Sequence, residues 1–219
     1  AFIADAVDTL KRQLAAIGIA AEVYGRPKHI YSIWNKMRAK HLDFSQVYDV
    51  RAVVHGLADV DSVLELRRGF GAGMVTALVR LEGETVGVLA NDPAHLGGAI
   101  DTDAADKAAR FLQLCDAHRI PMLYLCDTPG FMVGPDAERT AQVRHFSRMF
   151  VTAASMTVPF GTVVLRKGYG LGAQSMAGGS FKAGLFTLSW PTGEFGGMGL
   201  EGAVKLGFRR ELEAIEDPE

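Results

Sequence analysis

The stretch Arg166-Lys-Gly-Tyr-Gly-Leu-Gly-Ala-Gln-Ser-Met-Ala-Gly-Gly179 follows an apolar run, Thr162-Val-Val-Leu165, that is typical of a buried strand, and it precedes a predicted helix. Glycine has no Cβ, so its backbone can adopt a positive φ and can approach a ligand closely. Free amides at the start of a helix favour developing negative charge. The stretch therefore predicts either an oxyanion hole or a tight crossover between a strand and a helix of an α/β domain.

Composition narrows the class of protein. The chain has 219 residues, of which 48% are hydrophobic and 22% charged, which is ordinary for a soluble globular protein with one substantial core. A net charge of −2 argues against a nucleic-acid partner. No apolar run approaches the length of a membrane span, and no signal peptide opens the chain. We therefore expect a cytoplasmic protein with reduced thiols at Cys115 and Cys126, whose spacing suggests neither a metal site nor a disulfide.

Two compositions are joined in this chain. Residues 1–54 contain two of the 25 glycines and eight Lys or Arg against five Asp or Glu. Residues 55–219 contain the other glycines and 15 basic against 20 acidic residues. Such a change in glycine content and in charge sign predicts a boundary between a module at 1–54 and a second module at 55–219. Because residue 1 already lies inside a helical pattern, we also expect the chain to be a fragment.

The first module predicts a small α/β unit. Apolar residues from Ile3 to Ile17 recur at helical spacing, residues 21–24 suggest a short strand, and residues 47–54 suggest another. Between them lies a basic helix whose Arg26 and Lys28 could hold phosphates. The alternative is a solvated basic helix face.

A resemblance supports the phosphate-binding interpretation. Tyr24-Gly-Arg-Pro-Lys-His-Ile-Tyr-Ser-Ile-Trp-Asn-Lys-Met37, followed by Tyr48-Asp-Val-Arg-Ala52, resembles the synthetase domain of Rel/Spo-type (p)ppGpp synthetases. It implies a partial nucleotidyltransferase-like α/β fragment in which Arg26 and Lys28 line a nucleotide site and Asp49 binds Mg²⁺. The later strands of that family, with their catalytic carboxylate, do not occur here. We therefore expect at most weak binding of GTP or ATP, without pyrophosphate transfer.

The second module alternates strands and helices. We predict strands at 74–81, 85–90, 121–126, 159–166 and 185–190, with a hairpin turn at 82–84. Helices are predicted to begin near Thr102, to cover 137–154 and to begin again near Gly202. Strand pairs separated by helices indicate an α/β fold with ββα repeats.

Four glycine-bearing segments follow these strands, at residues 91–98, 127–134, 167–179 and 191–202. In α/β folds, ligands bind where strands give way to loops and to helix N-termini. Four such exits in succession favour a binding surface over simple packing. By contrast, His95 and His145 are lone histidines, for which structural roles are predicted.

In order, these segments resemble one family over residues 71–211. The residues that carry the resemblance are Ala90-Asn-Asp-Pro-Ala-His-Leu-Gly-Gly-Ala-Ile-Asp101, Asp106-Lys-Ala-Ala-Arg-Phe111, Asp127-Thr-Pro-Gly-Phe131, Leu165-Arg-Lys-Gly-Tyr-Gly170, Trp190-Pro-Thr-Gly-Glu194 and Met198-Gly-Leu-Glu-Gly-Ala-Val204. They are similar to the C-terminal half of the carboxyltransferase subunit of biotin-dependent acyl-CoA carboxylases, of the acetyl/propionyl-CoA type. The resemblance implies the crotonase-like superfamily, built from ββα units.

The resemblance also implies a site and a reaction. CO₂ would pass from carboxybiotin to an acyl-CoA, with backbone oxyanion holes stabilising the charge that develops. The biotin-side hole would fall within Gly170-Leu-Gly-Ala173, at the amides of Leu171 and Gly172. The substrate and biotin pocket would be shaped by Asp127, Thr128, Pro129, Gly130, Phe131 and Tyr169, with Gly97 and Gly98 near the reacting centre. Turn geometry is the alternative for Gly97 and Gly98, and loop capping is the alternative for Asp127.

The same resemblance implies partners. No Met-Lys biotinylation site occurs, so biotin would arrive on a separate biotin carboxyl carrier protein, loaded by a biotin carboxylase. The carboxyltransferase N-terminal half, from this or another protomer of a homo-oligomer, would complete the active site, and no bound metal is expected. We therefore expect autonomous activity to be absent or low. A noncatalytic module that docks the carrier is the alternative. A join at Tyr48–Arg51, a stretch that both families share, would explain the two modules as a fusion.

Overall fold

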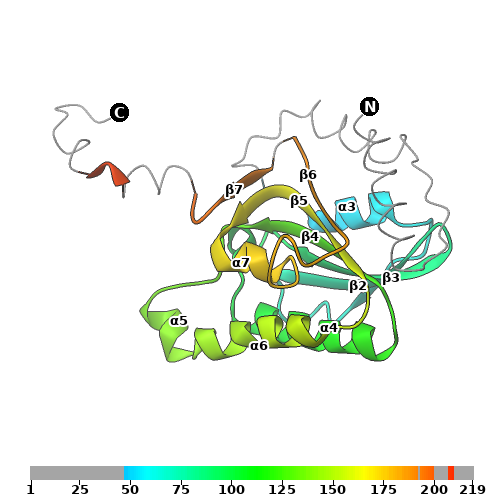
Figure 1. Cartoon of the computed structure of the whole chain (residues 1–219), viewed down its shortest axis with the longest axis horizontal. Helices are drawn as coiled ribbons and strands as arrows, with labels where there is room; N and C mark the ends of the chain where they lie inside the picture. Colours follow the sequence, from blue (N-terminus) through cyan, green and yellow to red (C-terminus); the bar gives the residue numbers. More distant parts are fainter. Residues whose placement is uncertain (1–46, 192, 200–206, 210–219) are drawn as a thin grey trace.

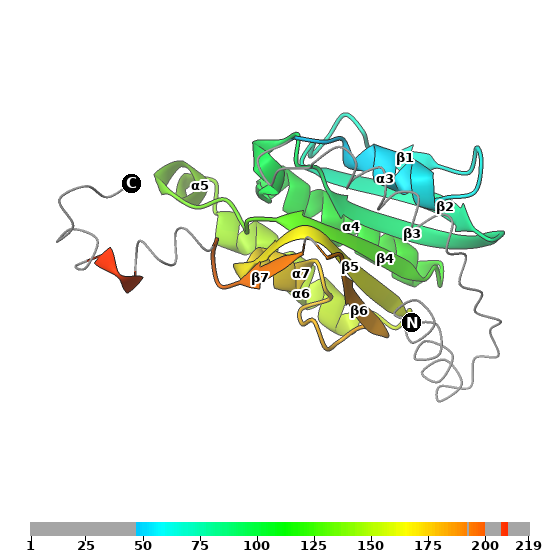
Figure 2. The ribbon, with the colours of Figure 1, turned by 90° about the horizontal axis from the view of Figure 1, so that it is seen from above.

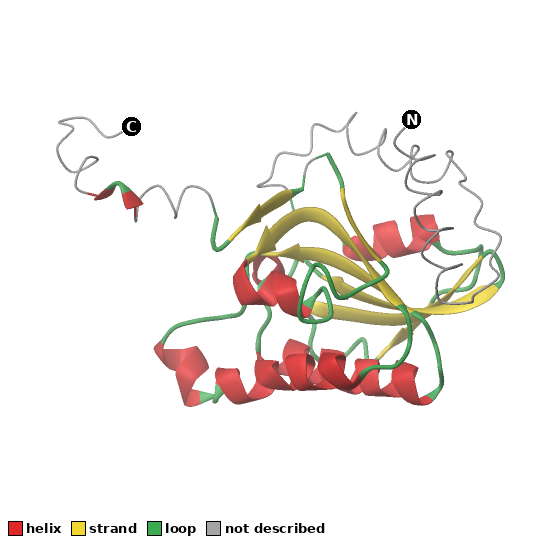
Figure 3. Ribbon diagram, viewed as in Figure 1, coloured by secondary structure: helices red, strands yellow, loops and turns green. Residues whose placement is uncertain are grey.

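The computed structural model describes residues 47–191, 193–199 and 207–209. Within them the chain forms α3 (Val50–Leu57), β1 (Leu64–Leu66), β2 (Met74–Leu81), β3 (Glu84–Asn91), the short 3₁₀ turn Leu96–Gly98 and α4 (Thr102–Ala117). There follow β4 (Met122–Thr128), α5 (Pro135–Arg139), α6 (Gln142–Ser155), β5 (Phe160–Tyr169), α7 (Gly170–Ser175), β6 (Phe186–Ser189) and β7 (Glu194–Gly196). Figure 3 shows how these helices and strands alternate.

The strands form one mixed sheet in the order β1-β2-β3-β4-β5-β6, with β7 also paired to β5. The pairs β1–β2 and β2–β3 are antiparallel, whereas the pairs β3–β4, β4–β5, β5–β6 and β5–β7 are parallel. The carboxyl ends of β3, β4 and β5 therefore point to the same edge of the sheet. The loops that follow these three strands meet at that edge.

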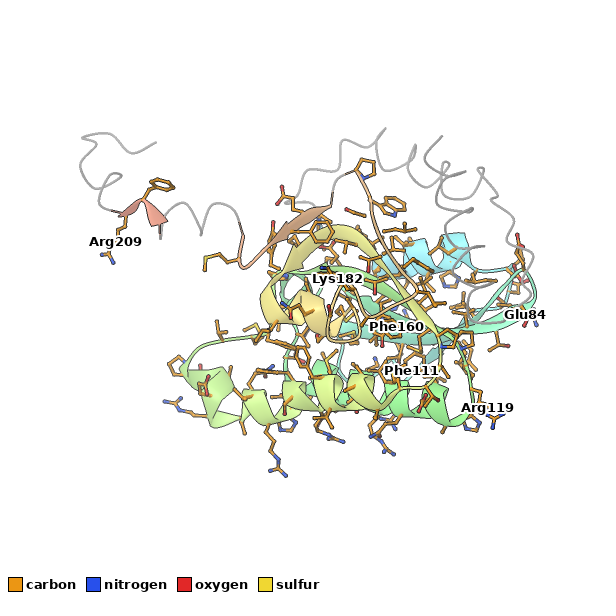
Figure 4. All side chains as sticks on the ribbon, in the orientation of Figure 1. Glu84, Phe111, Arg119, Phe160, Lys182 and Arg209 are labelled. Atoms are coloured by element: carbon orange, nitrogen blue, oxygen red, sulfur yellow. The ribbon has the colours of Figure 1, made fainter. Side chains whose placement is uncertain are left out.

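Helices cover both faces of the sheet. α4 and α6 lie side by side below it, and α3 lies on the opposite face (Figures 1 and 2). Along β2, successive residues alternate between two cores: Met74 packs toward the α4 layer, and Val75 and Ala77 pack toward α3. Phe111 of α4 and Phe160 of β5, labelled in Figure 4, both belong to the α4 layer.

Local sequence explains the hairpin and the long helix. Glu82 and Gly83 adopt φ of 52° and 88°, as the two-residue turn between β2 and β3 requires. Asp101 caps α4 by accepting a hydrogen bond from the amide of Ala104 over 2.8 Å. The predicted strands at 74–81, 85–90, 121–126, 159–166 and 185–190 and the helix that begins at Thr102 are confirmed.

The strand predicted at 47–54 is wrong, because residues 50–57 form the helix α3. Asp49 caps this helix, and Val50, Val53 and Val54 are buried at helical spacing against the sheet. Packing of this apolar face outweighed the preference of three valines for a strand. The boundary predicted between residues 54 and 55 falls inside α3, and the elements predicted before residue 47 lie outside the described residues.

Two further segments differ from their predictions. The single helix predicted at 137–154 is divided into α5 and α6, because Ala141 adopts a left-handed φ of 55° between them. The strand predicted at 159–166 continues to Tyr169, since residues 167–169 pair with β7. β1 and β7 themselves were not predicted, and the helix predicted from Gly202 lies outside the described residues.

Candidate active site

Three of the four glycine-bearing exits meet at the carboxyl edge of the sheet. The backbone of Gly98 lies so close to the carbonyl oxygen of Asp127 that a Cβ at residue 98 would come within 2.2 Å of it. A Cβ at Gly172 would lie 2.7 Å from the backbone of Gly130. The loop after β3 therefore packs on the loop after β4, and that loop packs on α7. At these two positions only glycine fits.

The fourth exit joins the same region through β7. The hydroxyl of Tyr169, at the end of β5, donates a short hydrogen bond to Glu194. A Cβ at Gly170 would lie 3.1 Å from the carbonyl oxygen of Gly197, and Gly170 itself has a φ of 60°. All four predicted exits thus contribute backbone to one edge of the sheet.

Asp127 is the buried centre of this edge. Its Oδ2 atom accepts hydrogen bonds from Tyr48 Oη over 2.7 Å and from Arg166 Nε over 3.1 Å. Its Oδ1 atom accepts from the backbone amide of Lys167 over 3.1 Å. The side chain has no exposed surface. A carboxylate with these partners is an ordered structural acceptor, and it ties β4 to β5 and to the segment before α3.

The Arg166 guanidinium also lies 5.1 Å from the centre of the Tyr48 ring. Burial, followed by the nearby Asp127 charge and the hydrogen bond to it, raises the pKa of Tyr48 well above its usual value. Tyr48 therefore stays a neutral donor toward Asp127.

The predicted oxyanion residues lie at the start of α7. The first amides of a helix have no acceptor within it, and in the described part of the chain the amides of Leu171 and Gly172 make no hydrogen bond outside α7. The Leu171 side chain is 56% exposed, whereas Gly172 and Ala173 are buried. Gly97 and Pro129, in the loops after β3 and β4, are exposed like Leu171.

Other predicted residues shape the loop after β4. Thr128 Oγ1 bonds both the amide and the carbonyl of Gly130 over 3.1 Å, which closes a tight turn. Phe131 stacks on Phe146 of α6 with ring centres 4.1 Å apart, so its ring packs toward the helix layer. A cavity of about 160 Å³ borders α3, β1 and β2, and none of the predicted site residues lines it.

The lone histidines have carboxylate partners. His95 Nε2 lies 3.1 Å from Asp101 Oδ2, and His145 Nδ1 lies 2.9 Å from Asp106 Oδ2. Asp49, predicted as a Mg²⁺ ligand, caps α3 and bonds Arg51. Arg26 and Lys28 lie outside the described residues. Among the residues that are described, no group of His, Cys, Asp and Glu is arranged to hold a metal ion, and no helix has the length and apolar character to cross a membrane.

Tyr48, Arg166 and Lys167 were not predicted as members of this site. Two signals were available. Arg166 and Lys167 are charged residues inside an otherwise apolar strand, directly before the glycine stretch. A buried charge requires a partner, and Asp127 is the carboxylate at the end of the neighbouring strand.

Comparison with known proteins decides the family. The model of the carboxyl transferase domain matches residues 5–218, nearly the whole chain. The chain belongs to the carboxyl transferase domain family. This is an enzyme family of the transferase type, and the α/β fold described above is shared with its solved members.

Two curated relatives support this family assignment for the chain. It is 39% identical over 178 residues to the methylmalonyl-CoA carboxyltransferase 12S subunit of Propionibacterium freudenreichii, covering 81% of this chain and 34% of that protein. It is 40% identical over 168 residues to the propionyl-CoA carboxylase beta chain of Cereibacter sphaeroides, covering 77% and 33%. The chain thus spans about a third of the length of these curated relatives.

Solved structures support the same family assignment. A single-chain, multi-domain long-chain acyl-CoA carboxylase matches with 61% identity and a TM-score of 0.75, over 76% of this chain and 17% of that one. The transcarboxylase 12S hexamer, solved with methylmalonyl-coenzyme A and methylmalonic acid bound, matches with 38% identity and a TM-score of 0.73, over 80% and 34%.

Proposed function

We propose that this chain is the C-terminal half of an acyl-CoA carboxylase carboxyltransferase, of the acetyl/propionyl-CoA type, which transfers CO₂ from carboxybiotin to an acyl-CoA. Membership of the carboxyl transferase domain family supports the reaction class. The observation that carries the site is the pair of amides at Leu171 and Gly172, which have no acceptor outside α7 in the described residues.

The residues of this edge fit biotin. Hydrogen-bond donors stabilise the negative charge that develops on a ureido oxygen, and backbone amides can supply them. The absence of a Cβ at Gly170 and Gly172 keeps the start of α7 close to Gly130 and to the carbonyl of Gly197. When bound, carboxybiotin would supply the CO₂ that is transferred.

The chain's own residues would act by position and by polarity. The amides of Leu171 and Gly172 would stabilise negative charge that develops on an oxygen placed between them. Such preorganised donors need no titrating side chain, which agrees with the fixed hydrogen bonds of Asp127. Thr128, Pro129, Gly130 and Tyr169 would form the wall beside the amides, and Gly97 and Gly98 would lie across from that wall.

The complete active site would include partners. Biotin would be carried by a separate carrier protein and loaded by a biotin carboxylase, and the N-terminal half of a carboxyltransferase would supply most contacts to coenzyme A. The transcarboxylase 12S relative forms a hexamer, which supports assembly from several protomers.

Biotin-dependent decarboxylation of malonyl-CoA tests the proposal, together with calorimetric titration of biotin. Leu171→Pro removes one amide donor at a helix position that tolerates proline, and Leu171→Ala keeps the amide as the matched control. We expect the proline variant to lose roughly 10²- to 10³-fold in rate, as when one oxyanion donor is removed, while the alanine variant stays near the wild type. Equal rates for the two variants, both folded by circular dichroism, would contradict the assignment.

A second candidate is weak binding of GTP or ATP by residues 24–51, which rests on the Gly25-Arg-Pro-Lys28 motif and on Asp49. The carboxyl transferase model also covers this segment, and the Asp49 carboxylate already caps α3. Titration of the chain with GTP and Mg²⁺ decides it. Saturable binding weakened by Arg26→Ala would support the candidate, and no saturation at millimolar nucleotide would end it.

A further inference from the structure

Lys167 connects two of the glycine-bearing exits through its side chain. It lies at the end of β5, where it pairs with Glu194 of β7. Its Nζ atom donates a hydrogen bond to the carbonyl oxygen of Gly97 over 2.6 Å, across 70 residues of sequence. A charged donor at this distance makes a strong bond to a backbone carbonyl.

Asp127 holds Lys167 at two points. The Oδ1 atom of Asp127 accepts from the Lys167 amide over 3.1 Å and lies 4.0 Å from its Nζ atom. The Lys167 side chain is 18% exposed. Burial lowers the pKa of Lys167, and the charge of Asp127 opposes that shift. Asp127 Oδ1 thus lies near both the backbone amide and the ammonium group of Lys167.

The charge of Lys167 is not needed to neutralise Asp127. Arg166 Nε already bonds the Asp127 carboxylate over 3.1 Å, and that guanidinium is buried with it. The Lys167 ammonium lies much closer to the Gly97 carbonyl than to Asp127, at 2.6 Å against 4.0 Å. Its geometry therefore serves the turn rather than the carboxylate.

Apart from the bond from Lys167, the turn at residues 96–98 packs on the rest of the fold at one side and is exposed at the other. Gly98 rests on the carbonyl oxygen of Asp127, but Gly97 and Leu96 are exposed. In the part of the chain that the structure describes, no other side chain hydrogen-bonds to the backbone of residues 96–98. Gly97 and Gly98 have φ of 63° and 90°, where glycine has several accessible conformations.

We propose that Lys167 is a positioning residue, whose ammonium fixes the carbonyl of Gly97 and so sets the conformation of the Gly97–Gly98 turn beside the end of β5. This effect of Lys167 on the turn does not depend on which reaction the chain catalyses. Its consequence for catalysis rests on the function proposed above, because that turn would then lie across the site from α7.

Hydrogen exchange measured by mass spectrometry tests the positioning role directly. Lys167→Met removes the donor and keeps an unbranched side chain that is one heavy atom shorter. Lys182→Met is the matched control, since Lys182 is exposed on the loop after α7 (Figure 4). We expect the peptide covering 94–100 to exchange at least about fivefold faster in Lys167→Met, with α4 unchanged, because the lost bond opens the turn locally.

Lys167→Arg keeps a charged donor and should restore much of the protection at residues 94–100. Three outcomes would overturn the proposal: no change at 94–100 in Lys167→Met, an equal increase in that peptide and in α4, or the same increase in Lys182→Met. An equal increase in α4 would mean that the substitution weakens the whole domain.

Kinetics then test the catalytic consequence. In the malonyl-CoA assay, Lys167→Met should lower kcat at least about tenfold with KM within about twofold, because the turn is misplaced rather than the substrate released. Because the chain alone is expected to have little or no turnover, the assay is run with the N-terminal half of a carboxyltransferase added. Absence of turnover in that mixture would count against the proposed function alone, since the exchange experiment decides the role of Lys167 by itself.

Discussion

Tyr48 and Asp127 are 79 residues apart in sequence, yet Tyr48 Oη donates a hydrogen bond to Asp127 Oδ2 over 2.7 Å. The bond joins the segment before α3 to the end of β4, the strand at the centre of the candidate site. Residue 48 belongs to the stretch in which sequence analysis placed a join between two modules. In the folded chain this stretch is part of the structure that supports the site.

Tyr48→Phe should destabilise the domain by about 1.5–3 kcal/mol, because a buried hydrogen bond to a charged acceptor is lost. Urea unfolding measures the change. Tyr124→Phe is a suitable control, since within the described residues its hydroxyl has only the weak acceptor Met156 Sδ at 3.6 Å. A Tyr48 variant as stable as the control variant would show that Arg166 and Lys167 satisfy Asp127 without the phenol.

Gly98→Ala and Gly83→Ala form a matched pair. Both glycines have a φ near 90°, but a Cβ at Gly83 meets nothing within 4 Å, whereas one at Gly98 would lie 2.2 Å from Asp127 O. Alanine in this conformation costs roughly 1–2 kcal/mol. The clash at Gly98 should add about 1–3 kcal/mol to the loss of unfolding free energy. Equal losses for the two variants would mean that the loop after β3 moves away from β4 at little cost.

Asp116 should contribute to the loss of stability of the domain at acidic pH. Its Oδ1 atom accepts from the Thr157 amide, the Thr157 hydroxyl and the Val158 amide. The hydrogen bond from the Thr157 amide is the main cause that lowers the pKa of Asp116. A lowered folded pKa stabilises the domain above the unfolded value of about 3.9, and this contribution is lost as pH falls through the folded value.

The direction of this pH dependence is checked by measuring the urea unfolding midpoint from pH 6 down to pH 3. The midpoint of the wild type should fall more steeply with acidification than that of Asp116→Asn, and Thr157→Val should give an intermediate slope. Because Asp116 is only partly buried, the difference should be modest. Parallel curves for the wild type and Asp116→Asn would contradict the prediction.

The two thiols should be unreactive in the folded protein. Burial raises the pKa of Cys115 to about 12 and also raises that of Cys126, and both side chains are fully buried. Thiol titration with a disulfide reagent at pH 8 should label neither cysteine within minutes in buffer and both in urea. Rapid labelling of either thiol without urea would indicate local opening around β4 or α4.

The sequence predicted elements whose signals are local. The strands at 74–81 and 85–90, the hairpin turn at 82–84 and the helix that begins near Thr102 each depend on a few adjacent residues, and each is confirmed. α3 was missed because its valines favour a strand, although Asp49 and the spacing of Val50, Val53 and Val54 carried the opposite signal.

The candidate site also contains some features that have local sequence signals and others that do not. Glycines at strand exits identified the segments that meet at one edge of the sheet, because such positions need close backbone approach. The contacts of Asp127 with Tyr48, Arg166 and Lys167 depend on the register of β4 against β5 and on where α3 docks. Neither quantity is encoded in a short run of residues. The charges inside an apolar strand indicated that Arg166 and Lys167 need a buried partner, but the contact with Tyr48 could not be read from the sequence.

β5 has paired neighbours along both of its edges: β4 on one, and β6 followed by β7 on the other. A strand held in this way cannot slip by one residue without breaking two ladders and reversing which side chains face each core. An insertion of a single residue between Phe160 and Tyr169 would therefore shift Gly170 out of step with Gly197, and Gly172 out of step with Gly130. Length variation among natural homologues is expected to fall in the loops around α5 instead.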